Sequence, residues 1–155
     1  MSLQEETGVL RNIPMFSTID PARLKLLSFT SERVSYMVGE EFIKQGEVGD
    51  SAFVIISGDA EVIIETADGP RSVGVVPAGQ LVGEIALLRS GRRTATLRAK
   101  TPVTGLLLSR DVFFHLLREF PDFSIAVMRD LAVRLERSTS QLGEALSQLG
   151  DARRQ

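Results

Sequence analysis

The spacing of apolar residues changes from a helical to a strand-like period early in the chain, and this change restricts the fold most. Asp20-Pro21, followed by closely spaced leucines, predicts a short capped helix. Val34, Tyr36 and Val38 then alternate with polar neighbours, as in a strand. Further β-branched or aromatic runs follow at 42–43, 53–56, 62–64, 73–76, 94–99 and 103–108. Glycine-rich turns separate these runs, among them Gly46, Gly49, Gly58 and the hairpin candidate Asp68-Gly69, so we expect a sandwich or barrel of short strands.

Helical periodicity returns after the last strand. Ser109 can cap a helix that runs to about Arg118, and Pro121 marks the start of another that continues towards Leu149. A seam of alternating three- and four-residue steps follows that last helix: Met128, Leu131, Leu135, Ser138, Leu142, Ala145 and Leu149. Either a second copy covers this seam, giving a homodimer through residues 122–149, or the helix folds back on the strands.

The 155 residues contain no Cys and a single His, His115, which excludes several kinds of site. Disulfides, thiolate metal sites and sites with two imidazoles cannot form, so we expect no metal centre and no metal-dependent phosphodiesterase. His115 lies in an apolar helical pattern and is expected to pack. No apolar run reaches the roughly 18 residues of a membrane span, and the N-terminus lacks a signal-peptide core, so we expect a cytoplasmic protein. The net charge of -2 gives no reason to expect nucleic acid as a partner.

Positive charge is concentrated between residues 84 and 110, where Glu84 is the only acid. Within this stretch, Gly83-Glu84 opens a short apolar helix that interrupts the strand pattern. The N–H groups of a helix's first turn favour an anion, and a carboxylate can accept from a pair of sugar hydroxyls. The guanidinium of Arg93, followed by Thr94 and the N–H of Ala95, matches phosphate oxygens. A sugar and a phosphate together indicate a nucleotide.

Two motifs extend this interpretation. Val82 to Leu87, then five residues and Arg93 to Ala95, resembles the phosphate-binding cassette of the cyclic-nucleotide-binding domains, as in protein kinase A regulatory subunits, catabolite activator protein and cyclic-nucleotide-gated channels. Ile43 to Asp50, with Phe53 to Gly58, is similar to the strand-turn-strand signature upstream in that family. The resemblance covers about residues 9–140. It implies a mainly β fold, a β-roll (a double-stranded β-helix, jelly-roll-like) with an N-terminal helix, a short cassette helix and C-terminal helices.

The resemblance also implies roles for individual residues. Glu84 would accept from the ribose 2′-OH, Arg93 would neutralise the cyclic phosphate, and the N–H groups of Ala86 and Ala95 would complete the phosphate cradle. Gly83 would permit close approach. The remaining expected contacts are Ile85 and Thr94 in the cassette, Val75, Leu81 and Leu97 under the base, and Arg129, Leu131 and Arg134 on a C-terminal helix that would close as a lid. Thr94 does not decide between the bases; we expect cyclic AMP, with cyclic GMP as the other ligand, and no cofactor.

The family resemblance divides the chain into four parts. We expect a flexible N-terminus at 1–8, a cyclic-nucleotide-binding β-roll with flanking helices at 9–121, a lid or dimerisation helix at 122–149 and a tail at 150–155. The expected function is a regulatory sensor, not an enzyme, that relays occupancy through its C-terminal helix. The alternatives are the sensor part of a truncated transcription regulator and the cytosolic gating domain of an ion channel. The effector and the oligomeric state stay open at this point.

Overall fold

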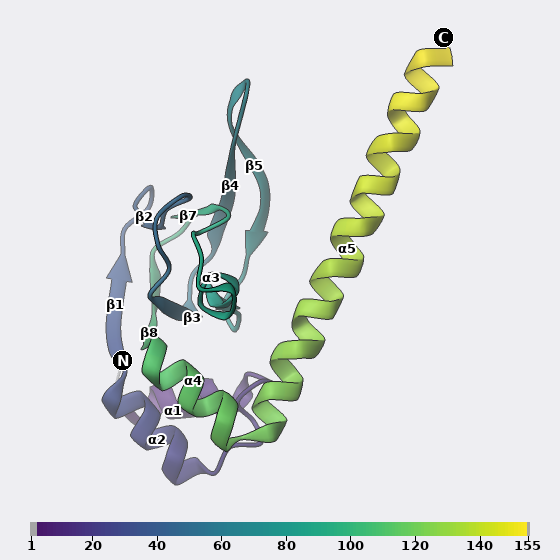
Figure 1. The fold of residues 1–155 in the computed structure, drawn as a ribbon. Helices are drawn as coiled ribbons and strands as arrows, with labels where there is room; N and C mark the ends of the chain where they lie inside the picture. The colour runs from purple at the N-terminus through teal and green to yellow at the C-terminus, as the bar shows by residue number, and fades with distance from the viewer. Residues whose placement is uncertain (1–2, 155) are drawn as a thin grey trace.

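The computed structural model describes residues 3–154 and confirms a mainly antiparallel β architecture with flanking helices (Figure 1). In chain order the elements are α1 (Leu3–Asn12), α2 (Pro21–Thr30), β1 (Glu32–Tyr36), β2 (Glu41–Ile43), β3 (Ser51–Ser57), β4 (Ala60–Thr66), β5 (Gly69–Val76), β6 (Leu81–Val82), α3 (Glu84–Arg89), β7 (Thr96–Ala99), β8 (Val103–Ser109), α4 (Arg110–Glu119) and α5 (Pro121–Arg154). The predicted caps are present: Asp20 accepts from the N–H of Ala22 at the start of α2, and Ser109 accepts from Val112 at the start of α4.

Two four-stranded sheets form the roll, with strand orders β1-β8-β3-β6 and β2-β7-β4-β5. Every paired strand is antiparallel. The turn expected at Asp68-Gly69 joins β4 to β5, and this hairpin extends beyond the rest of the roll (Figure 1). Antiparallel pairing through short turns follows from the regular glycine spacing of the sequence.

Strand β3 lies between two hydrophobic cores. Ala52, Val54 and Ile56 point into a core shared with the helices, whereas Phe53 and Ile55 point into a second core between the two sheets. Alternate side chains of a strand face opposite sides, so a strand covered on both faces must be apolar throughout. This accounts for the unbroken apolar run at 52–56.

Helix α1 begins at Leu3, so residues 3–8 of the N-terminal segment expected to be flexible are helical. Leu10, near the end of α1, is fully buried in the helix-side core, and Val9 packs against the same core. Helix α1 also packs on α2 (Figure 1). Burial of one apolar face by tertiary packing therefore stabilises a helix that its polar sequence does not predict.

The last helix is longer than expected. It was predicted over 122–149 with a tail from 150, but α5 runs without interruption from Pro121 to Arg154, a length of about 51 Å at 1.5 Å per residue. Only Phe123 and Val127 are buried, and residues 135–149 are all exposed. Within residues 3–154 no helix combines the length and the apolar character needed to cross a bilayer.

Gly105 provides a test of how tightly β8 packs against its neighbour β3 in the first sheet. A Cβ on Gly105, in β8, would overlap the carbonyl oxygen of Val54 and the ring of Phe53. We expect Gly105→Ala to lower the free energy of unfolding by about 1–3 kcal/mol, as overpacked cores do. Urea denaturation measures this loss as a lower midpoint with an unchanged m-value. Gly143→Ala is the matched control, because its Cβ meets open space within a helix, and it should be neutral or stabilise by up to about 1 kcal/mol.

Candidate functional site

Helix α3 interrupts the strands where the sequence predicts it, and Gly83 is its N-cap. The φ of Gly83 is 83°, in the left-handed region that residues with a Cβ rarely adopt. A Cβ on Gly83 would also lie 2.6 Å from Nη1 of Arg93. The glycine therefore turns the chain into α3 and leaves room for the guanidinium of Arg93.

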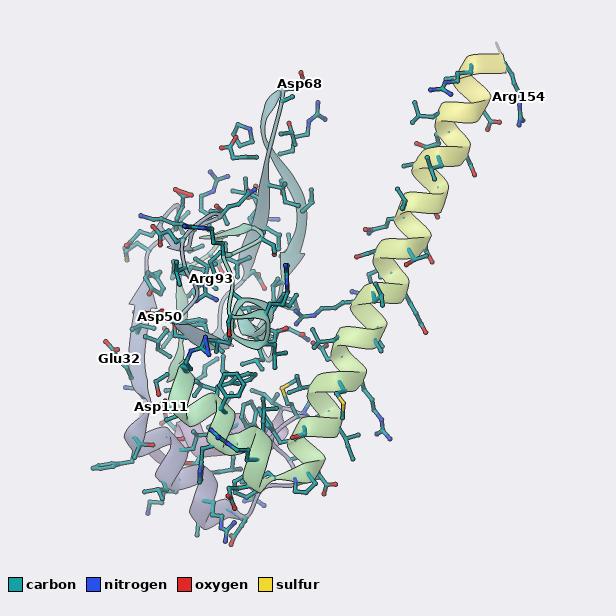
Figure 2. All side chains as sticks on the ribbon, viewed as in Figure 1. Glu32, Asp50, Asp68, Arg93, Asp111 and Arg154 are labelled. Atoms are coloured by element: carbon teal, nitrogen blue, oxygen red, sulfur yellow. The ribbon has the colours of Figure 1, made fainter. Side chains whose placement is uncertain are left out.

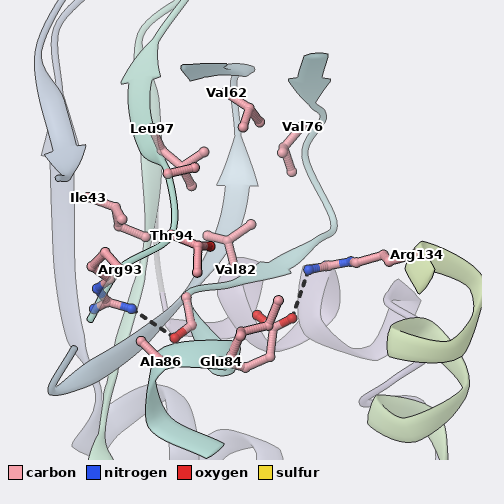
Figure 3. A pocket seen from close by; sticks show the side chains of 13 residues that line it. Ile43, Val62, Val76, Val82, Glu84, Ala86, Arg93, Thr94, Leu97 and Arg134 are labelled. Atoms are coloured by element: carbon pink, nitrogen blue, oxygen red, sulfur yellow. Dashed lines mark hydrogen bonds and ion pairs between the residues drawn. The ribbon is translucent and has the colours of Figure 1, made fainter. Parts of the chain in front are cut away.

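Two backbone carbonyls hold the guanidinium of Arg93. Nη1 donates to the carbonyl oxygen of Gly83 at 2.8 Å (Figure 3). Nη2 donates to the carbonyl oxygen of Ser51, also at 2.8 Å. Burial lowers the pKa of Arg93 from its ordinary value, and the carboxylate of Asp50 is the largest influence opposing that shift. Arg stays protonated in proteins and has five N–H donors. The site therefore holds a fixed positive charge with donors beyond the two carbonyl bonds.

Gly49 supports the same arrangement from the upstream motif. The sequence suggests that it forms a turn, but its φ is not among the positive values that mark the turn glycines Gly46 and Gly58. A Cβ on Gly49 would overlap the Cβ of Ala86 and lie 3.3 Å from Cζ of Arg93. Close approach, rather than a turn, is the reason for glycine at this position.

Glu84 is 1% exposed, and its carboxylate is bound by a side chain of the C-terminal helix α5. Its Oε1 accepts from Nη1 of Arg134 at 2.7 Å (Figure 3). Nη2 of Arg134 also donates to the carbonyl oxygen of Leu81 at 2.9 Å. Asp130, one turn earlier on α5, forms a second ion pair with Arg134 at 2.9 Å. The other oxygen, Oε2 of Glu84, is buried and has no hydrogen-bond partner within the described chain. Burial raises the pKa of Glu84, and the charge of Arg134 opposes that shift.

Glu84 and Arg93 line one pocket of about 150 Å³ between the second core and α3 (Figure 3). Most of the predicted cassette lies there: Gly83, Glu84, Ile85, Ala86, Arg93, Thr94 and Ala95, with Leu97 from β7 and Arg134 from α5. The two charged groups do not pair with each other, since Glu84 pairs with Arg134. The pocket thus joins a cationic donor group, a buried carboxylate and an apolar wall.

Four of the predicted contacts lie elsewhere. Val75 is 48% exposed, because it points to the outer side of β5 while its neighbour Val76 lines the pocket. Leu81 points into the helix-side core and its neighbour Val82 into the pocket. On α5, Arg129 is exposed and Leu131 packs against the helix-side core, so Arg134 is the lid candidate that reaches the pocket. The alternation of side chains along a strand decides the first two positions.

The sequence also leaves part of the apolar wall unidentified: Ile43, Val62, Val76 and Val82. Strand alternation is the signal for these residues, but it fixes the inward face only when the register is known. A register shift between Val62 and Ile63 breaks the simple alternation of β4 against β5. His115, expected to pack, is instead exposed on α4.

Comparisons with known proteins point to one family. The family model for the cyclic nucleotide-binding domain matches residues 33–120. The cAMP-dependent protein kinase regulatory subunit of Emericella nidulans is 34% identical over 108 residues, which are 70% of this chain and 26% of that protein. The acetyltransferase Pat of Mycolicibacterium smegmatis is 36% identical over 104 residues, 67% of this chain and 31% of that protein.

The crystal structure of the Thermus thermophilus catabolite activator protein superposes with a TM-score of 0.74 and 27% identity. The superposition covers 83% of this chain and 61% of the Thermus thermophilus chain. The chain spans about a quarter to a third of the two sequence relatives. With the family model matching more than half of its residues, the chain belongs to the cyclic nucleotide-binding domain family.

Proposed function

We propose that this chain binds a cyclic nucleotide, cyclic AMP in preference to cyclic GMP, as a regulatory sensor in the cytoplasm, and that it is not an enzyme. One observation carries the proposal. The guanidinium of Arg93 and the buried carboxylate of Glu84 line the same pocket, on either side of α3's first turn. A cyclic nucleotide presents a phosphate and a ribose hydroxyl on one small molecule, one for each of these groups.

The phosphate end is supported by the chemistry around Arg93. Two carbonyl bonds fix the orientation of its guanidinium before any ligand arrives, which reduces the entropy lost on binding. Ala86 lies in the first turn of α3, where N–H groups have no intrahelical acceptor. Ala95 lines the same wall of the pocket. Together these groups give a singly charged phosphate diester a cation and N–H donors.

The ribose end is supported by the unpartnered oxygen of Glu84. A buried polar atom without a partner is costly, and a hydroxyl of the ligand would satisfy Oε2. Oε1 can stay bound to Arg134 at the same time, because each carboxylate oxygen accepts independently. The proposed partner of this single unpartnered oxygen is the ribose 2′-OH.

The base end favours adenine on physical grounds. The wall formed by Val62, Val76 and Leu97 is apolar and offers no acceptor for the extra amino group of guanine. A donor buried without a partner costs about 1–3 kcal/mol, so guanine would depend on the hydroxyl of Thr94 alone. We therefore propose that cyclic GMP binds more weakly than cyclic AMP.

The relay to α5 would pass through the same carboxylate. Arg134 connects Glu84 to the C-terminal helix, and Asp130 holds Arg134 on that helix. A ligand bound at Oε2 changes the charge distribution on Glu84 and hence its attraction for Arg134. A ligand shifts a conformational equilibrium only through such a difference in contacts between the two states.

The proposal does not choose among the effectors that such a sensor can regulate. The kinase regulatory subunit and the catabolite activator protein are regulators of different outputs, so a kinase, a transcription regulator or a channel remains compatible with this domain. We propose self-association through residues 122–149, because Leu135, Leu142 and Leu149 of the predicted seam are all more than half exposed. No nucleic acid is proposed as a partner of these residues.

Removing the guanidinium tests the ligand site. Breaking a buried charge pair costs about 3–5 kcal/mol, so Arg93→Ala should raise the Kd for cyclic AMP by roughly a hundredfold or more. Isothermal titration calorimetry with cyclic AMP, cyclic GMP and linear AMP measures this and the base preference together. Arg92→Ala is the matched control, since Arg92 is exposed and bonds the carbonyl oxygen of Gly46 instead.

Two results would contradict the assignment of the phosphate site. One is an unchanged cyclic AMP affinity in a folded Arg93→Ala variant; the other is equal affinity for linear and cyclic AMP. Thermal unfolding of both Arg variants shows whether loss of the bonds to Gly83 and Ser51 has disturbed the fold.

The buried carboxylate gives a pH dependence with a definite sign. The pKa of Glu84 is raised above its ordinary value of 4.5 by burial. Its contribution to stability is therefore fully present below pH 4.5 and is lost as the pH rises through the folded-state pKa. Relative to wild type, Glu84→Gln should be least stable near pH 4 and should gain as the pH rises. Urea denaturation of the ligand-free protein at a series of pH values measures the difference. Arg134→Ala removes the opposing charge, so its free energy of unfolding should fall more steeply with rising pH than that of the wild type.

Movement of α5 on ligand binding can be measured as a change in distance between α5 and the β4–β5 hairpin. The chain has no Cys, so spin labels at Asp68→Cys, on the hairpin tip, and Ser140→Cys, on α5, report their separation without background. We expect cyclic AMP to shift the distance distribution measured by electron double resonance in labelled chain diluted with unlabelled chain, and Arg134→Ala to reduce that shift. Identical distributions with and without saturating ligand in the wild-type background would show that α5 does not respond.

A further inference from the structure

An apolar groove of about 590 Å³ lies between α2 and α4, away from the pocket described above. Leu27 and Leu116 are buried at its base, whereas Leu26 on its rim is 61% exposed. Charged side chains line both walls: Asp111 and Glu119 on α4, and Arg23 on α2, whose guanidinium lies over the ring of Phe120. The exposure of Leu26 means that the described part of the chain leaves this rim uncovered.

The outer half of α5 carries an exposed apolar stripe. Leu142, Leu146 and Leu149 are 60%, 59% and 55% exposed. Their spacing of four and then three residues puts them on one face of the helix. Arg153, four residues after Leu149, continues that face and is also exposed. The stripe is therefore three leucines followed by a cation.

A two-stranded coiled coil is a poor partner for this stripe. Ser138 and Ala145 occupy two of the seam positions in the outer half of α5, and Leu146 lies outside the seam. A helix that docks in a groove uses anchors at i, i+4 and i+7, which matches Leu142, Leu146 and Leu149. The groove between α2 and α4 is of this helix-accepting kind.

The stripe cannot reach the groove of its own chain. Leu142 is 21 residues beyond Pro121, about 32 Å along the helix, and α5 is uninterrupted between them. Figure 2 shows Arg154 at the far end of α5, widely separated from Asp111 at the start of α4. A straight helix that leaves the body in this direction presents its outer half to another molecule.

We propose that the outer part of α5, residues 142–153, docks in the α2–α4 groove of a second copy of this chain. The three leucines lie on the apolar base of the groove, and Arg153 meets one of the two carboxylates on the α4 wall. The lengths agree: Leu142 to Leu149 spans about 10 Å, and Asp111 to Glu119 on α4 spans about 12 Å. This inference names the surface used by self-association through α5 and does not depend on nucleotide binding.

Charged substitutions at exposed positions test the two halves of the contact separately. Leu142→Asp/Leu146→Asp removes the stripe, and Leu26→Asp removes the groove rim; neither touches a buried side chain. Sedimentation velocity over a concentration series should show self-association of the wild type and at least about a tenfold higher dissociation constant for each variant. The controls are Ser147→Asp, on the opposite face of α5, and Met37→Asp, an exposed apolar residue outside the groove.

Mixing the two variants is the decisive experiment. The groove variant keeps an intact helix and the helix variant keeps an intact groove, so an equimolar mixture should form a heterodimer with one contact. A fluorescent label on one variant detects that species.

Three results would overturn the proposal. They are a monomeric wild type at every concentration, normal self-association of Leu26→Asp, and absence of the heterodimer in the mixture. Normal self-association of Leu26→Asp together with loss in the helix variant would point to a coiled coil. Cyclic AMP titration of each variant should remain at the wild-type value, which separates failure of this contact from failure of the ligand site.

Discussion

The organisation of this domain depends on one buried carboxylate. Taking the charge of Glu84 out of water costs several kcal/mol, and Arg134, fifty residues away in the sequence, offsets part of that cost. Removing Arg134 leaves an uncompensated carboxylate inside the protein. Because Arg134 belongs to α5, the need to satisfy Glu84 also fixes how the start of α5 approaches the roll. The same group thus sets a local pKa and a long-range contact.

The second constraint is steric. Arg93 occupies space that side chains at Gly49 and Gly83 would fill, and those two glycines come from separate motifs. Arg93 also bonds the backbone at Gly83 and Ser51. The upstream turn, the cassette and the arginine are therefore one packed unit, which explains why motifs more than thirty residues apart occur together in a single sequence.

Much of the fold and the cassette could be predicted from the sequence, because they depend on local patterns. Neighbouring residues determine three of these features: the cap at Asp20, the helix at Gly83-Glu84 and the hairpin at Asp68-Gly69. The errors share a cause, since each needed information from a distant segment. Val75 was chosen over Val76 because the inward face of β5 depends on its register with β4 and on a register shift there. Helix α1 was missed because its stability comes from packing against α2 and the helix-side core.

Helix α5 is anchored along its first part, by the buried Phe123 and Val127, by Leu131 against the helix-side core and by Arg134 bonded to Glu84. From Arg134 to Arg154 it extends about 30 Å, at 1.5 Å per residue, as one rigid rod. A tilt of about 10° at the anchor would carry the tip through roughly 5 Å, by the geometry of a rod of that length. Side-chain adjustments of less than an ångström around the anchor are thus magnified, by leverage alone, into displacements large enough for another molecule to detect.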